Sequence, residues 1–361
     1  MDIQNTGLSY KTAQNILVYS KNKNSYVNTV INQLAIDKPD NFISYKIFNK
    51  NDKLNLPLPE GITVKEALEK YIDLSCQINA DILSKLVIFL TDSEQKQKIS
   101  DILQNKEKMS KFLEKRYNLT DFISEYNSLR LSLQDLCEIF PNIAPRYYTC
   151  CSSMSKNKNV IELIITLVSW KGVNDTLRFG LTSNYFNDLY QNKTFKDKEE
   201  FVEIAVKDSS FKLPKDPSTP LLMICTGSGI APFISFLQEM ESNKNNSYES
   251  YLIYGSKNRK NDFIFKKELE EYKKNKILTE CYTAFSRDQD HKIYVQDVLV
   301  EKFSKEKIKD LVVDKKMNVY VCGSSSMGNT VLTKLKELLG EENNEKMLKN
   351  GQLMSELWEN N

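Results

Sequence analysis

The sequence predicts two kinds of fold in one chain: an α+β part, in which an antiparallel sheet or barrel is interrupted by an all-helical block, and then a doubly wound parallel α/β part. Three observations predict this. Between about residues 65 and 140, apolar residues recur three and four positions apart, as in amphipathic helices. Segments on both sides of that block alternate like strands. Beyond a stretch with Pro and Lys near residue 215, strand, turn and helix follow one another several times.

The composition allows hydrophobic cores and excludes several classes of protein. The 361 residues are 40% hydrophobic and 27% charged, and the net charge of +2 is too balanced for a general nucleic-acid binder. No apolar run approaches the roughly 18 residues that cross a bilayer. Seven cysteines without CxxC or metal-ligand spacing predict reduced thiols in a cytoplasmic compartment and no metal site. The single histidine, His291, argues against a Ser-His-Asp triad.

The first part opens with short strand-like pieces at residues 16–20 and 43–47, and the Lys/Asn run at 21–25 predicts a solvated loop. Six helical segments follow, and strands then return. The predicted helices are 64–75, 80–90, 95–105, 108–117, 119–127 and 131–140, and the predicted strands are 145–153, 160–170 and 177–186. We therefore expect a barrel over 1–50 and 141–215, an inserted helical domain over 51–140, and an α/β domain over 216–361.

The second part alternates buried strands with amphipathic helices, which is typical of a parallel sheet covered on both faces. The predicted strands are 221–225, 251–255, 278–286 and 319–323; the predicted helices are 230–240, 262–274, 296–311 and 327–339, with a last helical stretch that ends at 354–358. In such sheets ligands bind at the carboxyl ends of the strands, near a switch point. Glycines stand at two of these ends, Gly227 with Gly229 and Gly323.

Two segments of the second part suit a nucleotide. Thr226, Gly227, Ser228 and Gly229 join a strand to a helix, where small residues let a phosphate reach backbone N–H groups. An isolated Gly-x-Gly fits an ordinary tight turn equally well.

The second segment, residues 286–296, favours the 2′-phosphate of NADPH over the bare ribose of NADH. Arg287 and Lys292 could bracket a phosphate, Ser286 could donate a hydrogen bond, and Tyr294 offers a ring to an adenine. The alternative is a solvated charged loop.

Aromatic and small residues in the first part suit a second planar ligand. Arg146, Tyr147, Tyr148 and Thr149 open a strand and could hold a pyrophosphate, stack on a ring and hydrogen-bond a ring nitrogen. The segment Gly180–Asn184 could present amides to another anion or be a plain turn. The aromatics of the strand could simply pack, and Trp358 could be a packing anchor.

Taken in order, these segments resemble the reductase half of the diflavin reductases, which is built on a ferredoxin–NADP reductase core. This family includes the NADPH–cytochrome reductases and the sulfite reductase flavoproteins. The resemblance runs from about Thr6 to Trp358. It rests on residues 6–22, 56–74, 145–153 and 180–186, and on the nucleotide segments 226–239, 285–296 and 319–323. The resemblance implies an FAD-binding barrel with a helical connecting insertion, followed by an NADPH-binding domain.

The resemblance also implies roles for individual residues. For FAD they are Arg146 on the pyrophosphate, Tyr148 (beside Tyr147) on the isoalloxazine, Thr149 near N5, Trp170 on the adenine, and Gly180, Leu181, Thr182 and Ser183 in the phosphate turn. For NADPH they are Thr226, Gly227, Ser228 and Gly229 on the pyrophosphate, and Lys257, Ser286, Arg287, Lys292, Tyr294 and Gln296 on the 2′-phosphate and adenine. Thr149, Cys322, Glu356 and Trp358 would surround the site of hydride transfer, with Trp358 shielding the flavin.

The function expected from the resemblance is transfer of electrons from NADPH through FAD to a separate acceptor, a flavodoxin, an FMN protein or a haem protein. The partners expected are NADPH and that acceptor protein, alone or in a larger complex, without nucleic acid or a membrane span. The alternative is a structural or interaction subunit that keeps the reductase fold with little or no electron transfer. A third interpretation is a fragment of a longer diflavin protein.

Several features depart from the family pattern. We expect that no flavodoxin-like domain precedes the barrel in this chain and that the first barrel strand is missing. Residues 13–15 replace the usual Gly-Asp-His, and Ser324 replaces the Asp that normally follows the Gly after Cys322. The turn before Gly227 reads Cys-Thr instead of Gly-Pro. We expect the missing strand to weaken FAD retention.

Overall fold

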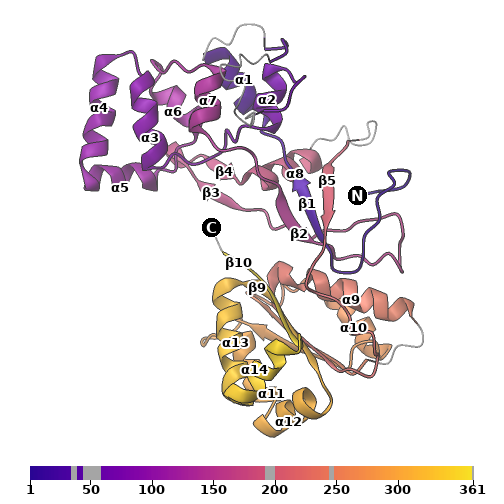
Figure 1. Cartoon of the computed structure of the whole chain (residues 1–361). Coiled ribbons are helices and arrows are strands. Elements are labelled where there is room, and N and C mark those ends of the chain that lie inside the picture. The colour runs from indigo at the N-terminus through magenta and orange to yellow at the C-terminus, as the bar shows by residue number, and fades with distance from the viewer. Residues whose placement is uncertain (34–38, 44–57, 192–199, 244–247, 360–361) are drawn as a thin grey trace. The chain divides into compact units, whose positions relative to one another are not determined.

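The computed structural model describes residues 1–33, 39–43, 58–191, 200–243 and 248–359 (Figure 1). Its contacts divide the chain into two compact units. One unit comprises Met1–Leu17, Tyr147–Ile165 and Ala205–Asn361, and the other comprises Val18–Arg146 and Thr166–Ile204. Most of the predicted strand at 43–47, and the predicted boundary at residue 50, fall outside the described residues. No helix of the described ranges has the length and apolar character needed to span a membrane.

A five-stranded parallel sheet with strand order β10-β9-β6-β7-β8 organises the first unit. Its strands are β6 (Leu221–Thr226), β7 (Ser250–Ser256), β8 (Glu280–Phe285), β9 (Asn318–Ser324) and β10 (Leu353–Trp358). The chain builds outward from β6 to β8 and then returns to the other side of β6 with β9. The direction in which successive strands are added therefore reverses between β6 and β9. This is the switch point at which ligands bind in such folds.

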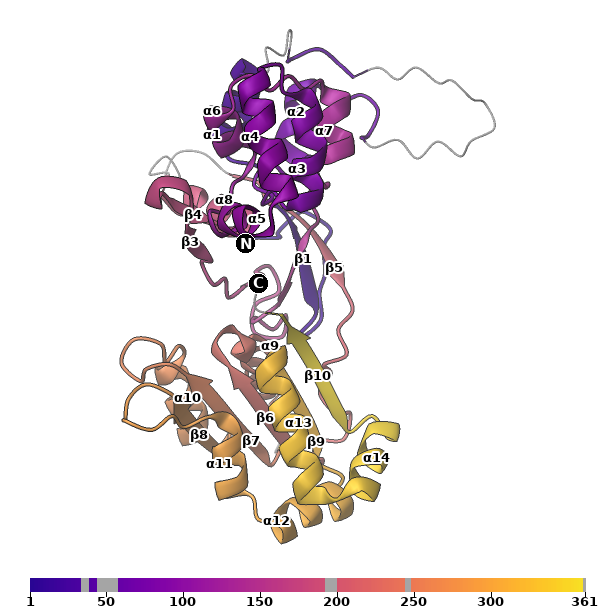
Figure 2. The same cartoon turned by 90° about the vertical axis from the view of Figure 1, so that its left-hand side faces the viewer.

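Helices cover both faces of this sheet (Figure 2). Met223, Cys225 and Tyr254 point to one side, where they pack with α9 (Ala231–Ser242) and α10 (Lys266–Lys274). Leu222 and Ile224 point to the other side. The elements packed there are α11 (Val295–Lys302), α12 (Lys305–Lys309), η5 (Asp310–Asp314), α13 (Ser325–Leu339) and α14 (Glu341–Lys349). Burial on both faces explains the continuous apolar run at 221–225, and the predicted doubly wound sheet is confirmed.

Seven helices form the core of the second unit (Figure 1). They are α1 (Asn24–Gln33), α2 (Val64–Lys70), α3 (Ala80–Leu86, continued by η1, Val87–Phe89), α4 (Ser93–Gln104), α5 (Lys106–Glu114), α6 (Leu119–Glu125) and α7 (Leu133–Ile139). Residues at helical spacing, such as Leu83 and Leu86, are fully buried. Capping boxes begin three helices, with N-caps Thr63, Asn118 and Ser132. The predicted helical block is thus confirmed.

Smaller sheets account for the remaining strands. Strands β1 (Asn15–Tyr19), β2 (Arg146–Thr149) and β5 (Glu203–Lys207) form one sheet in the order β2-β1-β5. Strands β3 (Ser169–Lys171) and β4 (Leu177–Phe179) form an antiparallel hairpin around η2 (Val173–Asp175). Of the predicted strand at 160–170, only its end is regular; Val160 and Leu163 make isolated bridges.

Two sequence predictions of secondary structure were wrong. Residues 354–358 form strand β10, because α14 ends at Asn350 and Gly351, with φ of +67°, turns the chain out of the helix. Residues 181–186 belong to helix α8 (Leu181–Gln191), not to a strand. The apolar residues Leu181, Tyr185 and Leu189 are four apart, which is a helical spacing that was taken for alternation.

The Lys/Asn run at 21–25 is also not a solvated loop. Asn22 is 4% exposed, and its Nδ2 donates to the carbonyl oxygens of Leu68 (2.7 Å) and Ile72 (2.6 Å) at the end of α2. Its Oδ1 accepts from the Leu74 N–H at 3.2 Å. Helix α1 begins two residues later. A buried amide that satisfies a helix end looks polar in the sequence but belongs to the core.

Candidate functional site

The turn after β6 is shaped to receive an anion. Thr226 ends the strand, and η4 (Gly227–Ile230) leads into α9 without a side-chain cap at its N-terminus. Gly227 has φ of +55°, and a Cβ at that position would meet no atom within 4 Å. The space beside Gly227 is therefore open at a helix start with free N–H groups, which is the arrangement that favours phosphate.

Gly229 has the opposite environment. A Cβ there would lie 2.4 Å from the carbonyl oxygen of Cys322 and 3.2 Å from Cη2 of Trp358. Only glycine lets the turn approach β9 this closely. The same contacts show that the Trp358 indole lies against the glycine turn, although the residue remains 40% exposed.

Strand β10 places Glu356 beside Cys322. The two residues are direct partners in the parallel pairing of β10 with β9, and Trp358 pairs with Ser324. The Glu356 carboxylate accepts hydrogen bonds from Ser209 Oγ (2.5 Å to Oε1) and Thr149 Oγ1 (3.4 Å to Oε2). The structure therefore brings together all four residues predicted to surround hydride transfer. Sequence reasoning missed Ser209, which no motif marks.

Two further contacts define this cluster. Thr149 Oγ1 also lies 3.3 Å from Oδ1 of Asn15, a residue that departs from the family pattern. Cys322 is 1% exposed, and burial, helped by the negative charge of Glu356, raises the pKa of its thiol well above the usual range. Cys322 is therefore a neutral thiol at physiological pH, not a nucleophile.

The predicted 2′-phosphate residues gather where β7 and β8 end. The Arg287 N–H donates to the Lys257 carbonyl (2.9 Å), which extends the pairing of these strands into the loops. The side chains of Lys257, Arg287 and Lys292 are exposed, and among the described residues none of them forms an ion pair. Tyr294 is 42% exposed at the start of α11. Exposed cations without carboxylate partners suit an incoming phosphate.

A scaffold that the sequence did not reveal holds these loops together. Asn258 Nδ2 donates to the Arg287 carbonyl (3.2 Å), and the Arg259 N–H donates to Asp288 Oδ2 (3.0 Å). The Arg259 guanidinium lies 4.6 Å from the ring centroid of Phe285, directly before Ser286. Both loops are thereby fixed to each other, which positions Arg287.

The predicted flavin residues of β2 lie on different faces of the strand. Tyr147 and Thr149 are two apart and share one face, whereas Tyr148 projects to the other. Tyr147 is 54% exposed with Lys207 Nζ 5.1 Å from its ring centroid, so its ring already has a cationic partner. Arg146 Nη1 donates to the Ala144 carbonyl at 2.9 Å, and the side chain is otherwise exposed.

The remaining predicted FAD residues lie together in the second unit. Trp170 is on β3, and Gly180 to Ser183 form the junction between β4 and α8. Ser183 Oγ accepts from the Val168 N–H (3.0 Å), and Thr182 Oγ1 is 2.5 Å from Ser20 Oγ. Since both hydroxyls are buried and bonded internally, the N–H groups at the start of α8 are the donors left for a phosphate.

An orphaned group tests whether FAD fits this unit. The Nε1 of Trp170 is buried and has no acceptor among the described residues. A buried donor without a partner is rare and calls for an explanation. An aromatic ring with an unused donor, on the hairpin that leads into the start of α8, is consistent with a dinucleotide that carries an adenine.

The fold and the site together define a class of protein, a flavoprotein oxidoreductase chain with a nicotinamide-nucleotide domain. The model of the FAD binding domain family matches residues 1–185, and the model described as oxidoreductase NAD-binding domain matches residues 223–333. Because the first match covers just over half of the 361 residues, the chain belongs to the FAD binding domain family. The predicted cofactors, FAD and NADPH, and the predicted oxidoreductase class are confirmed by these matches.

Individual relatives point the same way. The chain is 26% identical over 333 residues to NADPH–cytochrome P450 reductase of Mus musculus, covering 90% of this chain and 48% of that protein. It is 29% identical over 334 residues to NADPH oxidoreductase A of Dictyostelium discoideum (90% and 50%). It is 27% identical over 354 residues to the sulfite reductase (NADPH) flavoprotein component of Saccharomyces cerevisiae (96% and 33%). The chain spans half the length of these relatives or less, and the resemblance to the FAD- and NADPH-binding half is confirmed.

Proposed function

We propose that this chain takes a hydride from NADPH onto FAD and passes the electrons to a separate acceptor protein, a flavodoxin, an FMN protein or a haem protein. The observation that carries the proposal is the cluster at the switch point of the parallel sheet. Thr149, Glu356, Cys322 and Trp358 gather beside the glycine turn there, and Glu356 bonds Thr149 directly. Such a cluster of fixed polar groups is what orientation of a hydride donor needs.

FAD, when bound, supplies the ring that accepts the hydride. Glu356 provides a negative charge toward which the positive charge of an oxidised nicotinamide can develop, and Ser209 and Thr149 fix the direction of that carboxylate. Cys322 places a neutral, polarisable thiol beside the Glu356 carboxylate. Trp358 covers the glycine turn and must move for a nicotinamide to lie there, which is a gating role.

The nucleotide-binding residues are assigned on the same basis. The N–H groups of Gly227, Ser228 and Gly229 would hold the NADPH pyrophosphate, with Thr226 at the strand end. Lys257, Ser286, Arg287, Lys292, Tyr294 and Gln296 would hold the 2′-phosphate and adenine. Lys257, Arg287 and Lys292 support this assignment, because they are exposed and form no ion pair with any described residue.

The FAD-binding residues are assigned to three parts of the cofactor. Arg146 and Ser183, with Gly180, Leu181 and Thr182, would bind the pyrophosphate. Tyr148 with Tyr147 would contact the isoalloxazine, Thr149 would lie near its N5, and Trp170 would contact the adenine. Two observations support these assignments: Trp170 Nε1 has no acceptor among the described residues, and Gly180 to Ser183 lie at the start of α8. We further propose that β1, β2 and β5 belong to an FAD-binding antiparallel barrel over 1–50 and 141–215. The helices of 51–140 would form a connecting insertion that docks the acceptor. Residues 216–361 would form the NADPH domain. Seven free cysteines support a cytoplasmic location.

The test is a visible absorption spectrum of the purified chain, reconstituted with FAD and titrated with NADPH and with NADH. We expect flavin bands that NADPH bleaches far more readily than NADH, and NADPH-driven reduction of ferricyanide. A chain that binds FAD but is not bleached by either nucleotide would instead support a structural or interaction role. A chain that binds no flavin would contradict the proposal altogether.

A further inference from the structure

The hairpin that carries Trp170 carries a second residue with an unused donor. Trp170 on β3 pairs directly with Arg178 on β4, so both side chains lie on the same face of the hairpin. The Nε of Arg178 is buried and, like the Nε1 of Trp170, has no acceptor within the described part of the chain. Two unpartnered buried donors therefore occupy neighbouring positions on one small surface.

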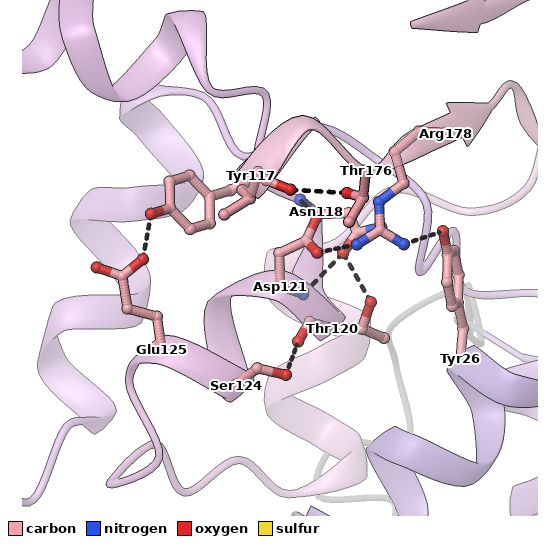
Figure 3. A network of polar contacts seen from close by, with 10 residues as sticks. Tyr26, Tyr117, Asn118, Thr120, Asp121, Ser124, Glu125, Thr176 and Arg178 are labelled. Carbon is pink, nitrogen blue, oxygen red and sulfur yellow. Dashed lines mark hydrogen bonds and ion pairs between the residues drawn. The ribbon is translucent and has the colours of Figure 1, made fainter. Parts of the chain in front are cut away.

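The Arg178 guanidinium is held through both of its terminal nitrogens (Figure 3). One terminal nitrogen, Nη2, pairs with the Asp121 carboxylate on α6, and the other, Nη1, donates to the Tyr26 hydroxyl on α1 at 3.1 Å. Asp121 is 8% exposed at its side chain and also caps α6 through Asn118, so it cannot easily turn away. The ion pair is thus largely shielded from water and fixes the plane of the guanidinium.

Gly172, in the turn of the hairpin, packs closely against the arginine side chain. A Cβ at Gly172 would lie 2.9 Å from Cγ and 3.5 Å from Nε of Arg178. A side chain there would push the arginine out of its position. Leaving a buried donor without an acceptor costs free energy of folding. On this face of the hairpin both Trp170 Nε1 and Arg178 Nε are such donors. A ligand that supplies acceptors to both groups would remove this cost.

We propose that Arg178 is a further binding residue for the adenosine half of FAD, whose Nε–H donates to an acceptor on that half, and that Asp121 is a positioning residue acting through Arg178. The proposal rests on the assignment of Trp170 to the adenine. Arg178 is not among the residues that the family resemblance assigns. The inference gives the helical insertion a direct part in FAD binding, because Tyr26 and Asp121 both lie on its helices or beside them.

The test compares the affinities for FAD and FMN, because FMN has the isoalloxazine but lacks the adenosine. Titration of the full-length apoprotein, followed by quenching of flavin fluorescence, gives both dissociation constants. In Arg178→Met we expect the FAD affinity to fall about tenfold or more, since a charge-assisted hydrogen bond is lost, while the FMN affinity stays within about twofold. Asp121→Asn should shift the same ratio by a smaller factor, and Arg178→Lys should restore it only in part.

The matched control is Lys171→Met, which removes an exposed cation from the same hairpin. It should leave the FAD to FMN ratio unchanged. Equal losses of FAD and FMN affinity in Arg178→Met, or the same ratio shift in the control, would mean that Arg178 only supports the fold, and the inference would be overturned. An unchanged FAD affinity in Arg178→Met would also overturn it, while leaving the proposed function intact. If the unaltered chain binds no FAD, the proposed function fails with it.

Discussion

Thr149 and Glu356, separated by 207 positions in the chain, meet through a hydrogen bond of 3.4 Å between Oγ1 and Oε2. The contact joins the motif that the family uses for flavin to the strand that completes the parallel sheet. Ser209 holds the other oxygen of the same carboxylate at 2.5 Å. The carboxylate thus has a fixed direction before any ligand arrives, and several predictions depend on it.

Glu356→Gln should slow hydride transfer about tenfold to a hundredfold, because an amide keeps the shape and one acceptor but removes the negative charge. NADPH affinity should change little. Stopped-flow bleaching of the bound flavin measures the rate. Glu359→Gln, an exposed carboxylate three residues away, is the control and should behave like the unaltered chain. An unchanged bleaching rate in Glu356→Gln would show that the carboxylate only supports packing.

Arg287→Ala should weaken NADPH binding about tenfold to a hundredfold and leave NADH binding nearly unchanged, because in the proposed site the lost charge would face only the 2′-phosphate. Steady-state KM values for the two nucleotides measure the selectivity. Lys260→Ala removes a neighbouring exposed cation and should alter neither value. Equal losses for both nucleotides would remove Arg287 from the 2′-phosphate site.

Trp358→Ala should improve the use of NADH, because the indole that covers the glycine turn no longer has to be displaced by the nicotinamide. We expect a several-fold rise in kcat/KM with NADH and a smaller change with NADPH. Trp358→Phe should fall between the two. If nucleotide preference stays as it was in both variants, the indole only packs.

Gly227→Ala and Gly229→Ala should separate nucleotide binding from stability. At position 229 a methyl group would meet the Cys322 backbone at 2.4 Å, so we expect a loss of about 1–3 kcal/mol in the free energy of unfolding. At position 227 it would project into open space, with a backbone cost of about 1 kcal/mol, while obstructing the phosphate. Urea unfolding and NADPH titration together test this. Equal stability losses would contradict the difference in their surroundings.

Stability should fall as the pH rises above about 9. Burial raises the pKa of the Cys151 thiol from its ordinary value of 9.0 to about 12. The folded chain therefore keeps a proton that the unfolded chain releases, so the contribution is fully present below pH 9 and is lost between pH 9 and 12. The loss is about 1.4 kcal/mol per pH unit within that window. Cys151→Ala should show a shallower decline between pH 8 and 10 in urea unfolding; an identical slope would exclude this thiol as its source.

The sequence was most informative where one rule decides the structure. Continuous apolar runs such as 221–225 predicted buried parallel strands, and apolar residues three and four apart predicted helices such as the one that begins at Val64. The order of motifs predicted that Thr149, Cys322 and Trp358 would gather around Glu356. Residues 354–358 were misassigned because an edge strand alternates weakly, and only the positive φ of Gly351 separates it from the helix before it.

Other parts of the site depend on contacts that have no local signal. Ser209 is an ordinary serine in the sequence, and its role comes from the approach of β10. Arg178 looks like a strand residue, and its importance comes from Asp121, 57 positions away. Asn22 was taken for a surface residue because a buried amide and an exposed one have the same letter. Such groups are defined by their partners, and these are brought near only by the tertiary fold.

Within the described ranges, β10 is an edge strand that pairs on one side only, with β9. An edge strand is held by a single ladder, so it opens at a lower free energy than a strand in the middle of the sheet. Glu356 and Trp358 share this strand, so a single local opening event withdraws the carboxylate and uncovers the glycine turn together. Fraying of this one ladder would open the glycine turn to a nicotinamide and remove the carboxylate from it at the same time, so the strand would have to pair again before hydride transfer.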